Sequence, residues 1–467
     1  IARTGSLPVQ DPAVETLWRQ EGSQPPLYYL LSAPLLLPID RNDLEARQAR
    51  NPHARIGIGL ATDNQAIVLH DWDAEAFPWR GTTLGVHLVR LFSVLLGLGT
   101  VVCIAHIARL AAPGRPAVQL TATLLAAFNP MFLFINASVN NDTLINLLSA
   151  AVMALLLHIW RAGLTSRRLW ALAVLLALAS LSKLSGLTLY PVAALVVLLV
   201  HARDRLGWRS LLRAGLLVVA VWAVVAGWWY WRNVRLYGEP TGMSRMIEII
   251  GARDASPSPG DLADEFEGLR LSFWGVFGML NVIAPDALFD YADALTVLAL
   301  LGGALAGGTA LVRRRRSGAS SQRSRFACWL DGHRAALPAA FLALHTLIVL
   351  VALINWTRQT PATQGRLLFP ALGGLATRKE VTITFAGEGG PAMHLLLYVP
   401  NRRDAPAPAF LGLNTLGNQE IHPDPGITIT RAWAPSFERL GRGSFGVVDN
   451  RATEASRGAM ASVARLS

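Results

Sequence analysis

The sequence predicts a mainly α-helical protein, a polytopic transmembrane helical bundle. Of its 467 residues, 52% are hydrophobic and only 16% are charged, whereas about 25% of the residues of an ordinary soluble protein are charged. Whole stretches of about 20 residues carry almost no charge, and that is the length a helix needs to cross a bilayer. These two observations predict several membrane spans.

The first segment, residues 1–83, contains an apolar stretch at 25–38. This stretch is shorter than a spanning helix. It begins with Pro25-Pro26 and contains Tyr28-Tyr29. Proline is favoured in a first helical turn and tyrosine at the membrane boundary. We therefore expect an interfacial or re-entrant helix over 25–38.

A transmembrane domain follows over residues 84–376. The apolar run from Leu169 to Val200 is divided by the polar turn Ser182–Gly186, so we assign two helices to it. A long loop separates the sixth and seventh spans, at 232–290. In total we expect eight spans, near 84–108, 117–136, 143–160, 169–183, 186–201, 214–231, 291–312 and 335–355.

Arginines mark every second loop between these spans, whereas the loop at 137–142 has none. Positively charged loops stay in the cytoplasm, so we expect a multi-pass protein of the inner or plasma membrane with residues 1–83 and 232–290 outside. This topology requires one more span before residue 1. The loop arginines are Arg109 and Arg115; Arg161, Arg167 and Arg168; Arg203, Arg205, Arg209 and Arg213; and Arg313–Arg316.

The net charge of +11 does not indicate a nucleic-acid partner, because the basic residues lie between apolar runs and not on one face. Cys103 and Cys328 are the two cysteines, too few for a zinc cluster. The histidines at 106, 158 and 345 lack metal-ligand spacing, so we interpret them as structural.

The character of the chain changes near Thr377. Residues 381–385 alternate as a strand, 387–390 suit a turn, and 394–399 predict a second strand. The stretch 409–414 has the pattern of a buried strand. We expect residues 377–467 to form part of an α/β or mixed domain.

Several polar residues lie at expected helix ends, and each has two interpretations. Asn140, Asn141 and Asp142 suit a helix N-cap as well as a binding site. Lys183 either binds a lipid phosphate or extends to the membrane surface. Arg232 and Arg366 suit bidentate phosphate binding or interfacial anchoring.

Two further features belong to the spans. Arg90 lies within a predicted span, where charged groups usually face the bundle interior or a water-filled cavity. The tryptophans at 228, 229 and 231 fit an aromatic belt at the membrane boundary better than a sugar-stacking platform.

The order and sidedness of these motifs resemble the GT-C glycosyltransferases related to protein mannosyltransferases and aminoarabinose transferases. The resemblance covers about residues 1–376. It is carried by Glu21 with Gln24-Pro25-Pro26-Leu27-Tyr28-Tyr29, Arg90 and Ser93, Asn129-Pro130, Asn140-Asn141-Asp142, Lys183, Trp228–Asn233 and Gln364-Gly365-Arg366.

The resemblance implies transfer of a sugar from a polyprenyl-phosphate donor in the membrane to a carbohydrate, lipid or protein acceptor on the external face. It implies that Glu21 holds a metal or orients the acceptor, with Mg²⁺ or Mn²⁺ as the candidate cation. The family's catalytic Asp is expected before Thr4, outside this chain. The implied substrate-binding residues are Gln24, Pro25, Tyr28, Arg90, Asn141, Asp142, Lys183, Arg232, Gln364 and Arg366.

The C-terminal segment resembles the start of bacterial glucuronoyl esterases, which are secreted α/β-hydrolases. The residues concerned are Thr377–Pro400, Phe410–Asn414, Gly417-Asn418, His422–Ile427 and Asn450–Gly458. That family's nucleophilic Ser, acid and His are expected beyond Ser467, so no triad is expected within the chain, and residues 377–467 are expected outside the cell.

Two other functions remain open from the sequence. One is a carbohydrate esterase, either anchored by the membrane region or joined to it by misassembly of the gene. The other is a transporter or non-catalytic membrane protein, which polar residues along a continuous pore would favour.

Overall fold

The fold is described from a computed structural model, which covers residues 4–14, 21–54, 65–253, 255, 257–316, 337–361, 363–378, 434–435 and 445–446. The chain divides into two compact units, Ile1–Thr382 and Ile383–Ser467. In the second unit the described residues form one antiparallel pair, β3 (Ala434–Pro435) with β4 (Phe445–Gly446). The expected strands between 381 and 414 lie outside the described residues, so the hydrolase-like segment stays a prediction.

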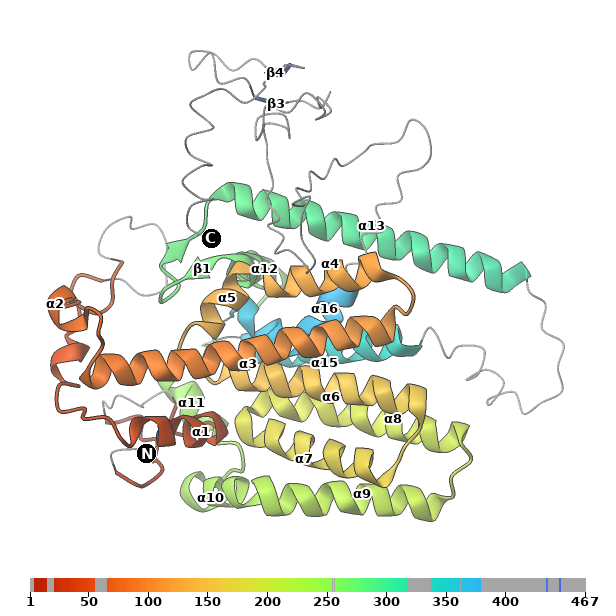
Figure 1. The fold of residues 1–467 in the computed structure, drawn as a ribbon, viewed down its shortest axis with the longest axis horizontal. Helices are drawn as coiled ribbons and strands as arrows, with labels where there is room; N and C mark the ends of the chain where they lie inside the picture. The colour runs from red at the N-terminus through yellow and green to blue at the C-terminus, as the bar shows by residue number, and fades with distance from the viewer. Residues whose placement is uncertain are drawn as a thin grey trace, which may run out of the picture. The chain divides into compact units, whose positions relative to one another are not determined.

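The first unit is a helical bundle (Figure 1). A short antiparallel pair, β1 (Val276–Phe277) with β2 (Val282–Ile283), accompanies the helices. The helices up to the middle of the chain are α1 (Leu27–Leu36), η1 (Ala46–Gln48), α2 (Trp72–Glu75), α3 (Gly81–Ala111), α4 (Pro116–Ala127), α5 (Pro130–Asn136), α6 (Asp142–Ala162), α7 (Ser166–Ser182), η2 (Leu184–Thr188), α8 (Leu189–Arg203) and α9 (Trp208–Trp222). After them come η3 (Ala223–Gly227), α10 (Trp228–Tyr237), α11 (Met243–Ile250), α12 (Pro259–Trp274), α13 (Asp286–Arg316), α15 (Leu337–Gln359), η4 (Gly365–Ala371) and α16 (Leu372–Arg378).

Five helices in the described part of the chain are long and apolar enough to cross a membrane, or six if the bent pair α4 and α5 counts as one span. The other two expected spans form helices, but α7 has only 17 residues and α13 carries Asp286, Asp290 and Asp293 in its first turns. A multi-pass membrane protein is therefore supported, and the number of eight spans stays a prediction.

The span expected near 117–136 consists of two helices. α4 and α5 meet at an angle of 57°. The cause is local: Pro130 starts α5, and the Asn129 side chain accepts a hydrogen bond from the Phe132 amide at 2.9 Å, which caps the new helix. The polar turn predicted at 182–186 is confirmed, because α7 ends at Ser182 and η2 begins at Leu184.

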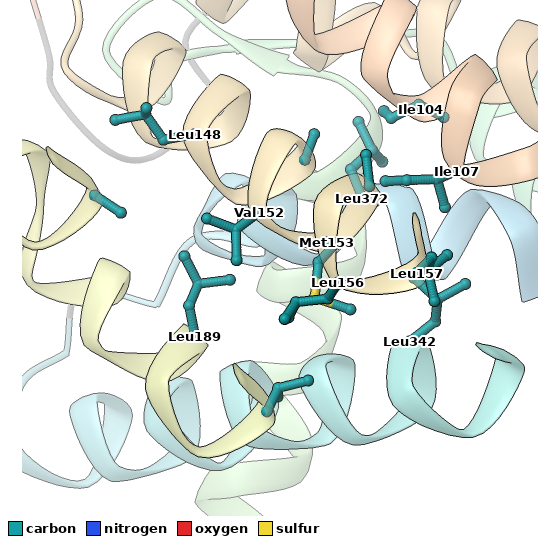
Figure 2. Packing of buried hydrophobic residues seen from close by; sticks show 14 of the residues in the cluster. Ile104, Ile107, Leu148, Val152, Met153, Leu156, Leu157, Leu189, Leu342 and Leu372 are labelled. Carbon is teal, nitrogen blue, oxygen red and sulfur yellow. The ribbon is translucent and has the colours of Figure 1, made fainter. Parts of the chain in front are cut away.

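Helix α6 is the centre of the bundle. About 78% of its most apolar stretch is buried, against 17–39% in the other four candidate spans. Figure 2 shows Val152, Met153, Leu156 and Leu157 of α6 among core side chains that include Leu189 of α8 and Leu342 of α15. Helix α3 buries small residues such as Gly85, Ser93 and Gly97, and such residues let neighbouring helices approach closely.

The loops gather at two ends of the bundle (Figure 1). At one end the Arg203 guanidinium lies over the Trp160 ring at 4.9 Å and donates to the Trp160 carbonyl, which brings the α6–α7 and α8–α9 loops together. At the other end Asn141 contacts Gln24, and Asp142 contacts Lys183. The arginine-rich loops are thus separated from the predicted site residues by the length of the bundle.

Candidate functional site

A cavity of about 370 Å³ lies at the end of the bundle opposite the α6–α7 and α8–α9 loops. Eight of the eleven residues predicted for the site line it, which brings together segments from residue 21 to residue 366. Those eight are Glu21, Gln24, Pro25, Asn141, Asp142, Lys183, Gln364 and Arg366.

Asp142 is the centre of a charged cluster in this cavity. Its side chain is only 5% exposed; Oδ1 pairs with the Lys183 ammonium, and Oδ2 lies 3.7 Å from Arg366 Nε. Local structure places each group: Asp142 begins α6, Lys183 is the extended residue that ends α7, and Arg366 lies in η4. Two basic side chains share one carboxylate, so the cluster has an excess positive charge suited to an anion.

Carboxamides extend the polar end of the cavity. Gln24 Oε1 accepts a hydrogen bond from Asn141 Nδ2 at 2.7 Å. The Asp142 amide donates to Asn140 Oδ1 at 2.8 Å. The Asn140 side chain thus accepts from the first amide of α6, whereas Asn141, the N-cap residue of this helix, makes no capping hydrogen bond with its side chain. The side chains of Asn141 and Asp142 instead line the cavity.

Glu21 lines the polar end of the cavity, where Tyr29 holds it. The Tyr29 hydroxyl donates to Glu21 Oε2 at 2.7 Å. Burial, together with the charge of Glu21, raises the pKa of Tyr29 well above its usual value, so the phenol stays a neutral donor. Among the described lining residues, Glu21 is the carboxylate that has no basic partner, and this leaves its second oxygen for a ligand.

The remainder of the cavity wall is mainly apolar, and Ser185, Thr188, Asn355 and Gln359 are its polar members. Helix α11 contributes Met243, Met246 and Ile250, and α15 contributes residues including Leu353 and Trp356. A ligand that fills the whole cavity would thus have a polar, anionic part and a hydrocarbon part. Sequence reasoning missed this wall because α11 lies within the long loop predicted at 232–290; its methionine and isoleucine spacing at 243, 246 and 250 is the signal that would have found it.

Tyr28, Arg90 and Arg232 were predicted to bind substrate and do not line the cavity. Tyr28 is fully buried; its hydroxyl lies 2.7 Å from Ser93 Oγ and accepts from the Asn140 amide at 3.2 Å. Tyr28 thus contacts the Asn140–Asp142 turn from outside the cavity lining.

Arg90 is exposed on α3, so the expectation that it faces the bundle interior is wrong. It lies 19 residues before Arg109, which is also exposed. In an α-helix that separation is about 28 Å, close to the thickness of the hydrocarbon layer. Both guanidinium groups can therefore reach headgroups, which removes the need for an interior partner.

Arg232 supports another part of the chain. Its Nη2 donates to the Pro8 carbonyl at 2.9 Å, and its guanidinium lies 4.9 Å from the centre of the Trp229 ring. Trp228 and Trp231 are exposed on α10, and no tryptophan of this run lines the cavity. Their positions suit the aromatic belt better than a sugar platform.

A divalent cation does not fit the side chains of this cavity. Within the described ranges no three His, Cys, Asp or Glu side chains come together. Glu21 and Asp142 are the carboxylates of the lining, and Asp142 lies between two basic groups, which would repel a cation. Mg²⁺ or Mn²⁺ stays a prediction that these residues do not support, and we derive no chemical step through a metal.

The fold defines a multi-pass helical membrane protein, and its described part contains an amphiphilic cavity. The family described as "Predicted membrane protein (DUF2142)" matches residues 81–374. This is more than half of the chain, and the protein therefore belongs to that family.

Likenesses to two known proteins were also found, one of them in two structures. The carbohydrate esterase MZ0003, from an unknown prokaryotic organism, is 45% identical over 92 residues, which are 20% of this chain and 20% of the esterase; the chain thus spans about a fifth of that relative. ArnT from Cupriavidus metallidurans bound to undecaprenyl phosphate is 16% identical, with a TM-score of 0.42 over 81% of this chain and 52% of ArnT. Apo ArnT is 14% identical, with a TM-score of 0.33 over 81% of this chain and 69% of ArnT.

Proposed function

We propose that this protein is a membrane glycosyltransferase of the GT-C type, which transfers a sugar from a polyprenyl-phosphate donor to an acceptor on the external face. The observation that carries the proposal is the cavity itself, which joins a basic cluster at Asp142, Lys183 and Arg366 to an apolar wall. That combination fits a lipid with an anionic headgroup.

The depth of the cluster supports a ligand that stays in the membrane. If Arg90 marks the headgroup level, Ser93 lies about 4.5 Å deeper along α3. Ser93 contacts Tyr28, and Tyr28 contacts the Asn140 amide. The charged end of the cavity then lies close to the depth of lipid phosphates, where a polyprenyl phosphate needs no extraction from the bilayer.

The reaction assigns a role to each charged group. The bond between the sugar's anomeric carbon and the phosphate oxygen breaks, its electron pair leaves with the phosphate, and a bond to the acceptor forms at that carbon. Lys183 and Arg366 stabilise the charge on the leaving phosphate. Glu21 orients the acceptor hydroxyl or amine and takes up its proton as the new bond forms.

The test is binding of undecaprenyl phosphate to the purified full chain in nanodiscs, followed by native mass spectrometry. Undecaprenol, which has the same hydrocarbon tail and no phosphate, is the matched control ligand. We expect undecaprenyl phosphate to bind and undecaprenol to bind at least tenfold more weakly, and Arg366→Met to remove most of this difference. Equal binding of the two lipids would refute the proposal. Incubation with polyprenyl-phosphate sugars would then identify the donor by release of undecaprenyl phosphate.

A second candidate function, carbohydrate ester hydrolysis, is favoured by the 92-residue likeness to the esterase. Its test is hydrolysis of a methyl glucuronate ester by the full chain. Hydrolysis that survives Glu21→Gln and Lys183→Met would assign this activity to a different part of the chain from the cavity.

A further inference from the structure

The segment at residues 7–10 is fixed to α10 although it lies far from it in the sequence. Leu7 packs against an apolar cluster that contains Trp229 and Tyr230. Arg232 Nη2 lies 2.9 Å from the Pro8 carbonyl and 3.4 Å from the Leu7 carbonyl. These contacts hold the backbone of the segment at a defined place beside the helix.

Gln10 connects this segment to the turn that carries Glu21 and Gln24. Its backbone amide donates to the Tyr237 hydroxyl at 2.9 Å, and its side-chain Oε1 accepts from the Ser23 amide at 2.7 Å. Gln10 is only 3% exposed, so these bonds are shielded from competing water. The turn is closed by its own bond, from the Gln24 amide to the Glu21 carbonyl at 3.1 Å.

Close packing on both sides leaves this turn little freedom. A Cβ atom added at Gly22 would lie 3.2 Å from Gln10 Cβ, and one added at Gly242 would lie 2.8 Å from Ser23 Cβ. Gly242 also has a φ of +62°, which disfavours other residues. Because Gly242 directly precedes α11, the same contact that confines Ser23 also fixes the start of the apolar wall.

We propose that Gln10 is a positioning residue, which sets the Glu21–Pro25 turn in the cavity while itself lying outside the lining. Tyr237 holds the backbone amide of Gln10, and Arg232 holds the segment just before it through the Leu7 and Pro8 carbonyls. This assigns to Arg232 a task that differs from the phosphate binding expected from the sequence. The positioning of the turn stands on the geometry alone, whereas its effect on sugar transfer rests on the proposed function.

The first test is hydrogen exchange of the full chain in nanodiscs. Gln10→Met keeps the length of the side chain and removes the acceptor for the Ser23 amide. We expect the peptide that contains Ser23 to exchange about tenfold faster, since one buried hydrogen bond is lost, while peptides of α6 and α8 stay unchanged. Gln48→Met, at a residue outside the cavity lining, is the matched control. Unchanged exchange at Ser23 in Gln10→Met would overturn the proposal.

A second variant keeps the test decisive if Gln10→Met folds poorly. Tyr237→Phe removes only the hydroxyl that accepts from the Gln10 amide, and Tyr291→Phe is its control on α13. For Tyr237→Phe we expect the same faster exchange at Ser23, a turnover number of sugar transfer about tenfold lower, and a Kd for undecaprenyl phosphate within twofold of wild type. A Kd that rises together with the loss of turnover would contradict a positioning role. If wild type binds no undecaprenyl phosphate, the proposed function fails and the exchange experiment still decides the role of Gln10.

Discussion

Asp142 shows how one residue serves both the stability of this protein and its candidate site. A carboxylate that is 5% exposed needs partners, and it receives them from Lys183 and Arg366. Both partners lie at helix ends and line the cavity. An arriving phosphate would compete with Asp142 for the same two cations, so the cluster is stable without ligand and still suited to bind one.

Replacing one partner tests this arrangement. Lys183→Met would leave the buried carboxylate with only the more distant Arg366, and we expect a loss of about 3–5 kcal/mol of stability together with loss of undecaprenyl phosphate binding. Thermal unfolding in detergent and native mass spectrometry measure the two effects. Lys183→Arg should recover most of the stability. Arg213→Met, at an exposed residue of α9, removes one positive charge elsewhere and should change neither the stability nor the binding of undecaprenyl phosphate. Equal losses in Arg213→Met would mean that the net charge, and not the contact with Asp142, is the cause.

At the scale of secondary-structure elements, the position of Arg366 depends on how closely η4 packs against α12. Gly365 lies between Gln364 and Arg366, and its amide donates to Ser272 Oγ of α12 at 2.7 Å. A Cβ atom at this position would lie 2.3 Å from the Phe273 amide nitrogen and 2.5 Å from the Leu269 carbonyl oxygen. These are backbone atoms, which cannot rotate away.

Gly365→Ala should therefore push η4 away from α12 and move Arg366 in the cavity. We expect a loss of about 1–3 kcal/mol of stability and weaker binding of undecaprenyl phosphate. The matched control is Gly268→Ala on α12, where no atom lies within 4 Å of the added Cβ, and it should be neutral or stabilising by up to about 1 kcal/mol. Comparable losses in both variants would show that helix α12 as a whole, and not the contact at Gly365, determines the result.

The start of α3 gives a prediction that depends on pH. Asp43 accepts from the Thr82 hydroxyl at 2.6 Å and from the Thr82 amide at 2.9 Å. The bond from the Thr82 hydroxyl lowers the pKa of Asp43 below its usual value. Its contribution to stability is therefore fully present above about pH 4, the unfolded value, and is lost as the pH falls through the lowered value.

Asp43→Ala should reduce stability at pH 7 by about 0.5–2 kcal/mol, the usual loss for a helix cap. The difference in Tm from wild type should shrink as the pH falls below about 4. Melting curves between pH 7 and 3 measure this, with Asp73→Ala at an exposed position as the control. A difference that stays constant down to pH 3 would mean that Asp43 acts through packing and not through its charge.

At the scale of the whole molecule, the features that were best predicted from the sequence are those that a lipid bilayer requires, such as the length of its apolar helices. Apolar length predicted the helices at 84–108, 143–160 and 335–355, because lipid demands long uncharged runs. Alternating arginines predicted that Gln24, Lys183 and Arg366 lie on the same side of the membrane, and the resemblance implied that they bind one substrate; all three line the cavity. Features that depend on packing were missed.

The misses share a physical cause. The break at Asn129-Pro130 was not predicted because its apolar flanks suggested one span. Whether the side chains of Arg90 and Arg232 face the cavity depends on which face of each helix packs against the rest of the protein. A single sequence does not reveal that face. The helix α11 has only 8 residues, which is too short to stand out by apolar length within the loop at 232–290.

The sidedness of the whole bundle remains a prediction, and it can be tested with two cysteines. Val139 is 48% exposed at the cavity end, and Ser166 is exposed at the end of the arginine-rich loops. After Cys103 and Cys328 are replaced by Ser, we expect Val139→Cys to react with a membrane-impermeant maleimide in intact cells, and Ser166→Cys to react only after permeabilisation. The positive-inside rule gives this direction. The opposite labelling would place the cavity on the cytoplasmic side, where a transferase would have to take its sugar from a donor facing the cytoplasm, and the proposed external reaction would fail even if undecaprenyl phosphate binds.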